Sequence, residues 1–277
     1  MLLQRVITAV VLLAILLPAL FASNPIWFAL LTLVMIGAAG WEWSRLNGRG
    51  GPVAVLVGIA LAGLCAGTFY LIGFKVPSWC WWLAGGLWVL GGVRALAAGV
   101  AGWPKLSPAL RLALGMVLLW AAWLALIVAR QRGINFLLSA MCLVWMADVA
   151  AYFSGKAFGR RKLAPAISPG KSWEGAIGGL IGVIVLGAVW VHVIDVRVPV
   201  DSASMYSVLV HRTGWVSLLA IAFLSAMSVV GDLFESLVKR AAGAKDSSQL
   251  LPGHGGVLDR VDALLPVLPL ALALTSL

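Results

Sequence analysis

Charged residues are scarce in this sequence. They make up 11% of its 277 residues and only ten of them are acidic, whereas 62% of the residues are hydrophobic. A soluble globular domain carries about a quarter charged residues, because its surface faces water on all sides. The shortage of charge therefore excludes an ordinary soluble enzyme and indicates that most of the surface faces lipid.

Other features are missing as well. The three cysteines stand singly and form no C-x-x-C pair, which excludes a disulfide scaffold. The sequence has no G-X-Y period, no charged heptads and no long polar tract, which excludes collagen, coiled coil and disorder. We also find no internal repeat and no linker long enough to separate two soluble domains.

Long apolar runs, in contrast, are abundant. A bilayer core about 30 Å thick needs about 20 apolar residues per helix, and the runs do not alternate as barrel strands do. The predicted fold class is therefore all-α, a polytopic integral membrane protein with about nine transmembrane helices. The predicted spans are residues 4–22, 25–45, 53–74, 79–99, 109–130, 134–153, 174–194, 215–238 and 257–275.

The basic residues predict the orientation in the membrane. Fifteen of the 20 lysines and arginines fall in the N-terminus or after even-numbered spans, and such residues favour the cytoplasmic side. We therefore expect a cytosolic N-terminus in the inner membrane of a bacterium. Residues 1–130 are interpreted as N-terminal transmembrane helices, and residues 131–277 as a catalytic region with cytosolic loops at 154–173 and 239–256.

The few acidic residues are not scattered. A carboxylate inside a membrane costs at least a few kcal/mol, so its position is informative. With the orientation above, seven of the ten acidic residues lie at the cytosolic boundary: Asp148, Glu174, Asp232, Glu235, Asp246, Asp259 and Asp262. This clustering predicts a polar site at one edge of the membrane.

Spacing groups some of these acids on helix faces. Asp232 and Ser236 are separated by four residues, and Asp259 and Asp262 by three, so each pair shares a face. Two faces that carry oxygen ligands suit Mg²⁺ with a substrate phosphate. We predict Asp232, Asp259 and Asp262 as metal ligands.

The alternative interpretation is that acids pair with neighbouring cations. Glu235 and Lys239 are four residues apart and fit an ordinary helical ion pair. For Glu235, this structural pairing and a role in function are equally favoured. Glu42 and Arg45, three residues apart, are predicted to form a surface pair.

Residues 168–175, S-P-G-K-S-W-E-G, precede a predicted helix. Backbone N–H groups at a helix N-terminus and a lysine suit a phosphate. A P-loop would need glycine at position 165, where this chain has Pro165, so that motif is excluded. Lys171, Ser172 and Glu174 are predicted to bind substrate.

The segment Ser236–Asp262 resembles the signature of phosphatidate cytidylyltransferases, also called CDP-diglyceride synthases. A second resembling block runs from Ala147 to Gly175, and the specific resemblance covers the C-terminal half. The matching residues of the signature are Ser236, Lys239, Arg240, Lys245, Asp246, Pro252, His254, Gly255, Gly256, Asp259, Arg260 and Asp262.

The resemblance implies a nucleotidyltransferase of phospholipid biosynthesis. It would convert CTP and phosphatidic acid into CDP-diacylglycerol and pyrophosphate by in-line attack on the α-phosphorus, with Mg²⁺. The implied catalytic residues are Asp232, Ser236, Lys239, Asp246, Asp259, Arg260 and Asp262. Substrate binding would add Arg240, Lys245, His254, Gly255 and Gly256.

The expected partners are CTP, phosphatidic acid and membrane lipid, without nucleic acid. The sequence leaves open a homodimer and a monovalent cation beside the magnesium. A secondary transporter is disfavoured, because transporter sites lie at the bilayer midplane between repeats. CDP-alcohol phosphotransferases are disfavoured too, since their motif begins with an Asp-Gly pair and this chain has none.

Overall fold

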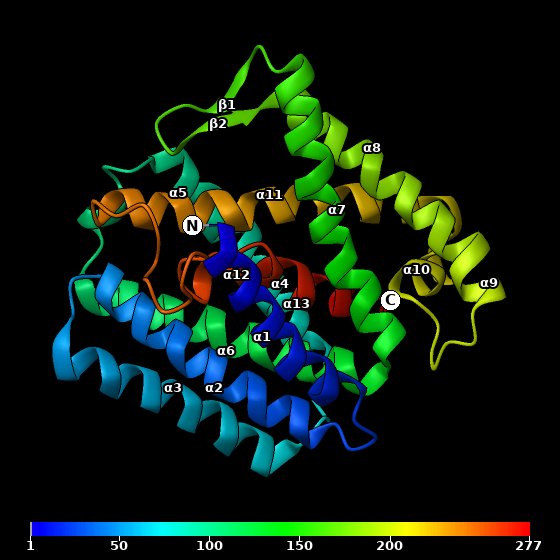
Figure 1. Cartoon of the computed structure of the whole chain (residues 1–277), viewed down its shortest axis with the longest axis horizontal. Coiled ribbons are helices and arrows are strands. Elements are labelled where there is room, and N and C mark those ends of the chain that lie inside the picture. Colours follow the sequence, from blue (N-terminus) through cyan, green and yellow to red (C-terminus); the bar gives the residue numbers. More distant parts are fainter. Residues whose placement is uncertain (1) are drawn as a thin grey trace.

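The computed structural model describes residues 2–277 as a bundle of helices with one small hairpin (Figure 1). The all-α prediction is thereby confirmed. In chain order the elements are α1 (Leu2–Phe21), α2 (Ile26–Leu46), α3 (Gly51–Ile72), α4 (Ser78–Leu87), the π-helical turn η1 (Trp88–Gly92), α5 (Val93–Ala98), the 3₁₀ turn η2 (Trp103–Lys105), α6 (Pro108–Arg132), α7 (Ile134–Phe158), β1 (Lys162–Ala164), β2 (Ser168–Ser172), α8 (Trp173–Val189), the π-helical turn η3 (Trp190–Ile194), α9 (Asp195–Arg197), α10 (Met205–Thr213), the 3₁₀ turn η4 (Gly214–Val216), α11 (Ser217–Ala241), α12 (Leu258–Val261) and α13 (Leu264–Leu274).

Seven helical segments in the described part of the chain are long and apolar enough to cross a membrane. They agree with seven of the nine predicted spans, and helix α1 (Leu2–Phe21, 20 residues) covers most of the first predicted span, residues 4–22. These seven segments are Ile26–Leu46, Gly51–Ile72, Ser78–Ala98, Pro108–Arg132, Ile134–Phe158, Trp173–Arg197 and Met205–Ala241.

The ninth predicted span is not one crossing helix. It is divided into α12, a single turn, and α13, whose 11 residues rise by about 16 Å. The break lies at Asp262 and Ala263, where the carboxylate of Asp262 interrupts the apolar run. Residues Leu264–Ala273 of α13 are all buried, and Figure 1 shows α13 in the middle of the bundle. This segment is therefore core rather than a span.

Glycines allow two helix pairs to approach closely. A Cβ at Gly179 of α8 would meet the carbonyl oxygen of Ala147 on α7, and a Cβ at Gly58 of α3 would overlap the carbonyl oxygen of Gly37 on α2. Small residues at such contacts let helix backbones pack directly in membranes. The α7 and α8 pair lies side by side up to the hairpin (Figure 1), and it holds the predicted loop 154–173 at one edge of the molecule.

That predicted loop is more ordered than expected. Residues up to Phe158 continue α7, and β1 and β2 then form an antiparallel hairpin that pairs Lys162 with Ser172. Because α8 begins directly after β2, the hairpin and the α8 N-terminus form one unit. The far end of α7 is secured by Asp201, whose carboxylate accepts hydrogen bonds from the N–H of Ile134 (2.6 Å) and Asn135 (3.0 Å).

Candidate active site

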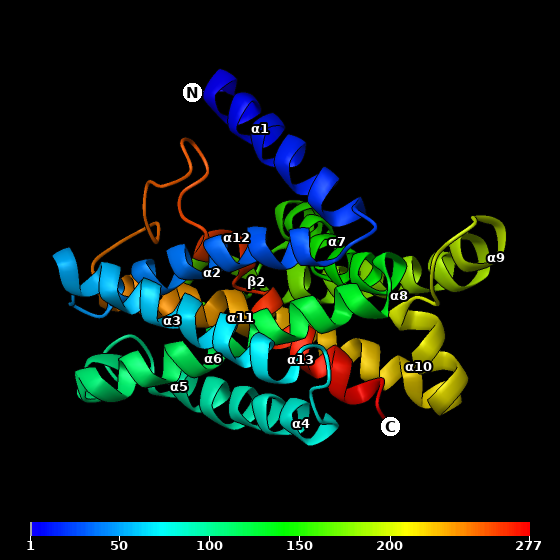
Figure 2. The ribbon, with the colours of Figure 1, turned by 90° about the horizontal axis from the view of Figure 1, so that it is seen from below.

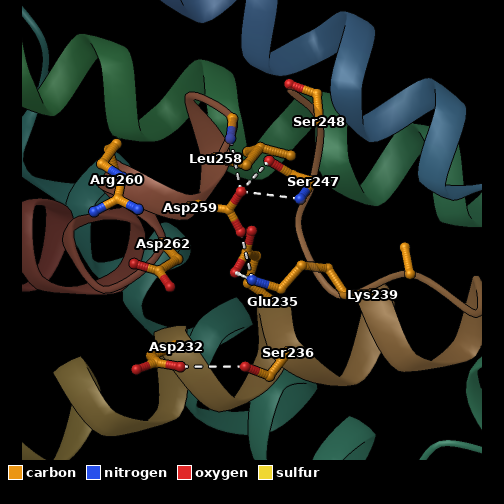
Figure 3. A network of polar contacts seen from close by, with 12 residues as sticks. Asp232, Glu235, Ser236, Lys239, Ser247, Ser248, Leu258, Asp259, Arg260 and Asp262 are labelled. Carbon is orange, nitrogen blue, oxygen red and sulfur yellow. Dashed lines mark hydrogen bonds and ion pairs between the residues drawn. The ribbon is translucent and has the colours of Figure 1, made fainter. Parts of the chain in front are cut away.

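The C-terminal half of α11 carries a row of polar side chains. Asp232 Oδ2 forms a 2.6 Å ion pair with Lys171 Nζ of β2, and Ser236 Oγ donates to Asp232 Oδ1 at 3.3 Å. The four-residue spacing does place Asp232 and Ser236 on one face (Figure 3). The ion pair joins the hairpin to α11 across a cleft.

The cleft encloses about 480 Å³ between α7, the hairpin, α8 and α11. Its polar lining combines two acidic residues, Asp148 and Asp232, with the cationic Lys156 and Lys171. The remaining lining residues are Ala147, Ala151, Tyr152, Gly155, Leu163, Ser168, Gly170, Ser172, Gly175, Ala176 and Val229. Residues predicted from three separate sequence segments thus meet in one hollow, which has the size typical of small-molecule sites.

Asp262 lies at the junction of α12 and α13, beside α11. The two backbones approach at Gly231, where a Cβ would contact the carbonyl oxygen of Asp262. Burial raises the pKa of Asp262 above its usual range, and the charges of Asp232 and Asp148 act in the same direction. Asp148, Asp232 and Asp262 therefore form a group of repelling carboxylates, and Lys171 offsets part of their charge.

Asp259 differs from Asp262 in its contacts. Lys239 Nζ lies 2.5 Å from Asp259 Oδ1 and 2.5 Å from Glu235 Oε2. Asp259 Oδ2 accepts from Gly256 N (2.8 Å), Ser247 N (2.9 Å) and Ser247 Oγ (2.8 Å). Burial alone would raise the pKa of Asp259, but these donors lower it to about 2. These four contacts tie the 242–257 loop to α12 and, through Lys239, to α11.

The predicted helical pair of Glu235 and Lys239 is confirmed. The structure adds that Glu235 is only 3% exposed and that Lys239 bridges it to Asp259, twenty residues further along the chain. Figure 3 shows Lys239 reaching between the two carboxylates. The bridge fastens the 242–257 loop to α11.

Glu42 is the residue that the sequence interpretation missed. The predicted surface pair with Arg45 is wrong, because Glu42 is fully buried and Arg45 stacks on the ring of Trp41. Glu42 accepts four hydrogen bonds from the segment between residues 247 and 258, donated by Ser247 Oγ (3.3 Å), Ser248 Oγ (2.6 Å), Val257 N (2.9 Å) and Leu258 N (2.8 Å). An acidic residue in an apolar run is by itself a signal of function.

The glycines of the signature are explained by this packing. Gly255 has a φ of +80°, a conformation that residues with a Cβ rarely adopt. A Cβ on Gly256 would overlap Ser247 Oγ and the Glu42 carboxylate. The pair therefore shapes a backbone turn against two carboxylates.

Gly256→Ala tests this packing. We expect it to lower the free energy of unfolding by about 2 kcal/mol or more and to reduce activity, since the methyl group forces apart a buried hydrogen-bond network. Thermal unfolding of the detergent-purified protein measures the first effect. Gly50→Ala is the matched control, because nothing lies within 4 Å of a Cβ at Gly50, and equal melting of the two variants would contradict the expectation.

Two of the predicted substrate-binding residues have structural contacts around the hairpin. Ser172 caps α8 by accepting from Gly175 N (3.1 Å) while also lining the cleft. Glu174 accepts from the backbone N–H of Arg160 (3.1 Å) and Arg161 (3.2 Å). Both side chains thus fasten the hairpin that carries Lys171 to the start of α8.

The remaining predicted residues lie around the 242–257 loop. Arg240 donates to the carbonyl oxygen of Ile167 (3.4 Å), and Arg260 to that of His254 (3.0 Å). Nδ1 of His254 is buried, and no described residue is its hydrogen-bond partner. Lys245 and Asp246 are exposed and line a separate hollow of about 810 Å³ beside α2. The structure therefore does not bring Lys245 and Asp246 into the cleft.

Comparison with known proteins covers nearly the whole chain. The model of the family described as "Cytidylyltransferase family" matches residues 3–277. A phosphatidate cytidylyltransferase of Pseudomonas aeruginosa is 38% identical over 99% of this chain and 97% of its own length. Proteins of that name from Haemophilus influenzae (38% identical, 97% and 96% covered) and Brucella suis (36%, 94% and 88%) are also similar.

Proposed function

Because the chain belongs to the cytidylyltransferase family, we propose that the cleft around Asp148, Lys171 and Asp232 joins CTP to phosphatidate. The products are CDP-diacylglycerol and pyrophosphate, so the chain is a nucleotidyltransferase of phospholipid biosynthesis. The match confirms the resemblance predicted from Ser236–Asp262, and it extends that resemblance through the N-terminal half.

One observation carries the assignment of the site. Lys171 is held at 2.6 Å from Asp232 in a cleft that a second carboxylate, Asp148, also lines. A lysine ammonium binds phosphate as a point charge, and carboxylates bind the cation that accompanies a nucleotide. Both kinds of group needed for a triphosphate therefore stand next to each other.

In the proposed reaction the chain mainly positions and neutralises its substrates. An oxygen of the phosphatidate phosphate forms a bond to the α-phosphorus of CTP, while the bond from that phosphorus to the bridging oxygen of pyrophosphate breaks. Lys171 and Lys156, which line the cleft, would neutralise the phosphates. Lys239 and Asp259 would not touch the substrates. They fix the 242–257 loop, which leads into α12 and Asp262.

The donor set suits Mg²⁺. Asp232 and Asp262 provide hard oxygen ligands with excess negative charge, and Ser236 Oγ lies beside Asp232. Among residues 2–277, no three His, Cys, Asp or Glu side chains form a complete ligand group. Mg²⁺ commonly binds through one or two carboxylates plus substrate phosphates, so a site of two carboxylates is sufficient for it. We therefore propose Asp232 and Asp262 as its ligands, with Asp259 as a support, and the ion would neutralise charge on CTP.

We also propose that the site faces the cytosol at the inner membrane of a bacterium. Supporting this, basic residues gather at the edge where the hairpin and the end of α11 lie, among them Arg160, Arg161, Lys162, Lys239 and Arg240. Such residues favour the cytoplasmic side, and CTP is a soluble nucleotide. A lipid phosphate and a nucleotide meet at this edge.

The proposed function is tested by turnover of labelled CTP. Purified protein with phosphatidate is expected to form labelled CDP-diacylglycerol, and Lys171→Met is expected to lower kcat/KM by about a hundredfold, the usual effect of removing one charge-stabilising group. The matched control is Lys75→Met, which lies in the loop after α3, away from the cleft lining. Absence of product from the unmodified chain would overturn the function, and normal turnover by Lys171→Met would overturn the site.

A further inference from the structure

A second, almost purely apolar groove lies beneath α1. It encloses about 340 Å³ and is bounded by α1, α2, α6, α7 and the segment from Val257 to Leu268. Thr32 is the polar side chain in its lining, and its hydroxyl already donates to Phe28 O (2.8 Å) and accepts from Trp123 Nε1 (3.1 Å). Ordered water needs two to four polar partners, so this groove suits a hydrocarbon ligand.

Helix α1 lies over the groove as a strap. Figure 2 shows α1 standing away from the rest of the bundle. At one end Thr8 Oγ1 donates to Pro252 O of the signature loop at 2.9 Å. At the other end the buried Arg130 donates to Leu20 O (2.8 Å) and Ala22 O (2.8 Å). Between these ends the groove is lined by Leu13, Leu16 and Leu17.

The groove begins where the catalytic residues lie. Val257 follows Gly256 directly and Val261 precedes Asp262 directly, and both valines line the groove. On α7, Trp145 lines the groove, while Asp148, three residues further along the same helix, lines the polar cleft. Residues three apart share a helix face. The apolar groove and the polar cleft share no lining residue, but they border the same face of α7, and the groove is also lined by the chain neighbour of Asp262.

We propose that this groove binds one acyl chain of the lipid substrate. The inference rests on the proposed function, because that function places the lipid phosphate in the neighbouring cleft. The chain would run from Val261 and Trp145 toward the turn between α1 and α2, where the contacts of Arg130 close the end. A groove closed at one end makes acyl-chain length a determinant of substrate choice.

Filling the groove tests the proposal. Ala39 and Ala122 line it and are buried, so Ala39→Leu and Ala122→Leu each place extra carbon atoms there. With dioleoyl phosphatidate we expect KM to rise about tenfold or more, as for expelling about two methylene groups from the groove. With dihexanoyl phosphatidate, whose chains are too short to fill the groove, we expect kcat and KM to change less than about twofold.

Ala62→Leu is the matched control. Ala62 borders a shallow groove between α2 and α3 that shares no lining residue with the groove under α1, and this variant is expected to treat both substrates as the unmodified chain does. Equal KM changes for the long and the short substrate in Ala39→Leu and Ala122→Leu would overturn the proposal. Failure of the unmodified chain to use either substrate would instead overturn the proposed function.

If Ala39→Leu and Ala122→Leu do not fold, a labelling experiment tests whether the groove holds an acyl chain. Phosphatidate with a photoreactive group near the end of one acyl chain is irradiated with the unmodified protein, and labelled peptides are identified by mass spectrometry. Labels on Leu16, Leu20, Met35 or Met141, which line the groove, are the expected result. Labels confined to residues outside the lining would show that the groove holds only bulk lipid or nothing, and would overturn the proposal.

Discussion

Asp262→Asn is expected to lower kcat by about a thousandfold while the protein stays folded. The change removes one negative charge from the group formed with Asp232 and Asp148, and electrostatic groups that act on a transferring phosphoryl are typically worth about 10² to 10³ in kcat. Burial and neighbouring acids already disfavour the charged form of Asp262, so an amide costs little stability. Turnover of labelled CTP and thermal unfolding measure the two quantities.

Two companion variants sharpen this expectation. Asp232→Asn is expected to match Asp262→Asn, and the double variant to be little worse than either, since residues that act as a unit are not additive. Asp201→Asn changes a carboxylate of the same kind at the far end of α7, and its kcat is expected to stay within about twofold. Near-normal turnover by Asp262→Asn with Mg²⁺ would remove Asp262 from the metal site.

Glu42→Ala is expected to lower both stability and activity, although Glu42 lies on α2 and 205 residues before Ser247. The change leaves the buried donors on Ser248, Val257 and Leu258 without their acceptor, while Ser247 Oγ keeps its bond to Asp259 Oδ2. Each unsatisfied buried group costs about 1 to 3 kcal/mol, so we expect a loss of about 3 kcal/mol or more. Thermal unfolding measures this loss, and kcat and KM for CTP are measured at a temperature where the variant is folded.

Glu42→Gln and Arg45→Ala separate the possible causes. Gln keeps the volume and one acceptor oxygen, so it is expected to recover part of the stability and of kcat. Arg45 is exposed and contacts Trp41 instead of Glu42, so Arg45→Ala is expected to change little. If Arg45→Ala lowered the free energy of unfolding as much as Glu42→Ala does, the result would support an ion pair of Glu42 with Arg45. It would contradict the role of Glu42 in holding the 242–257 loop.

Local patterns in the sequence account for much of the fold and site. The lengths of the apolar runs predicted seven segments that are also long enough to span in the structure. Helical spacing predicted the ion pair of Glu235 with Lys239 and the shared face of Asp232 and Ser236. These predictions succeed because hydrophobic length and the i, i+4 relation depend only on residues close in the chain.

Local patterns also failed at particular places. Residues 257–275 are apolar enough for a span, yet the polar junction at Asp262 and Ala263 divides them into α12 and a buried α13. Glu42 and Arg45 have the spacing of a helical ion pair, but Glu42 is buried and its carboxylate accepts hydrogen bonds from the 242–257 loop and the start of α12. The spacing of Asp259 and Asp262 does not tell their contacts apart: Asp259 accepts from Lys239, Gly256 and Ser247, whereas Asp262 accepts from the N–H of Ala263.

The lipid environment, the helical class and the family follow from composition and motif alone. The lipid environment and the helical class follow because charge is costly in lipid and this chain has little of it. The family follows because its signature residues have a fixed spacing in the sequence. The role of each carboxylate depends on which donors reach it from distant segments. Because Glu42 reaches Val257 and Lys171 reaches Asp232 only when α2, the hairpin, α11 and α12 pack, the tertiary structure alone shows which acids hold the loop and which border the cleft.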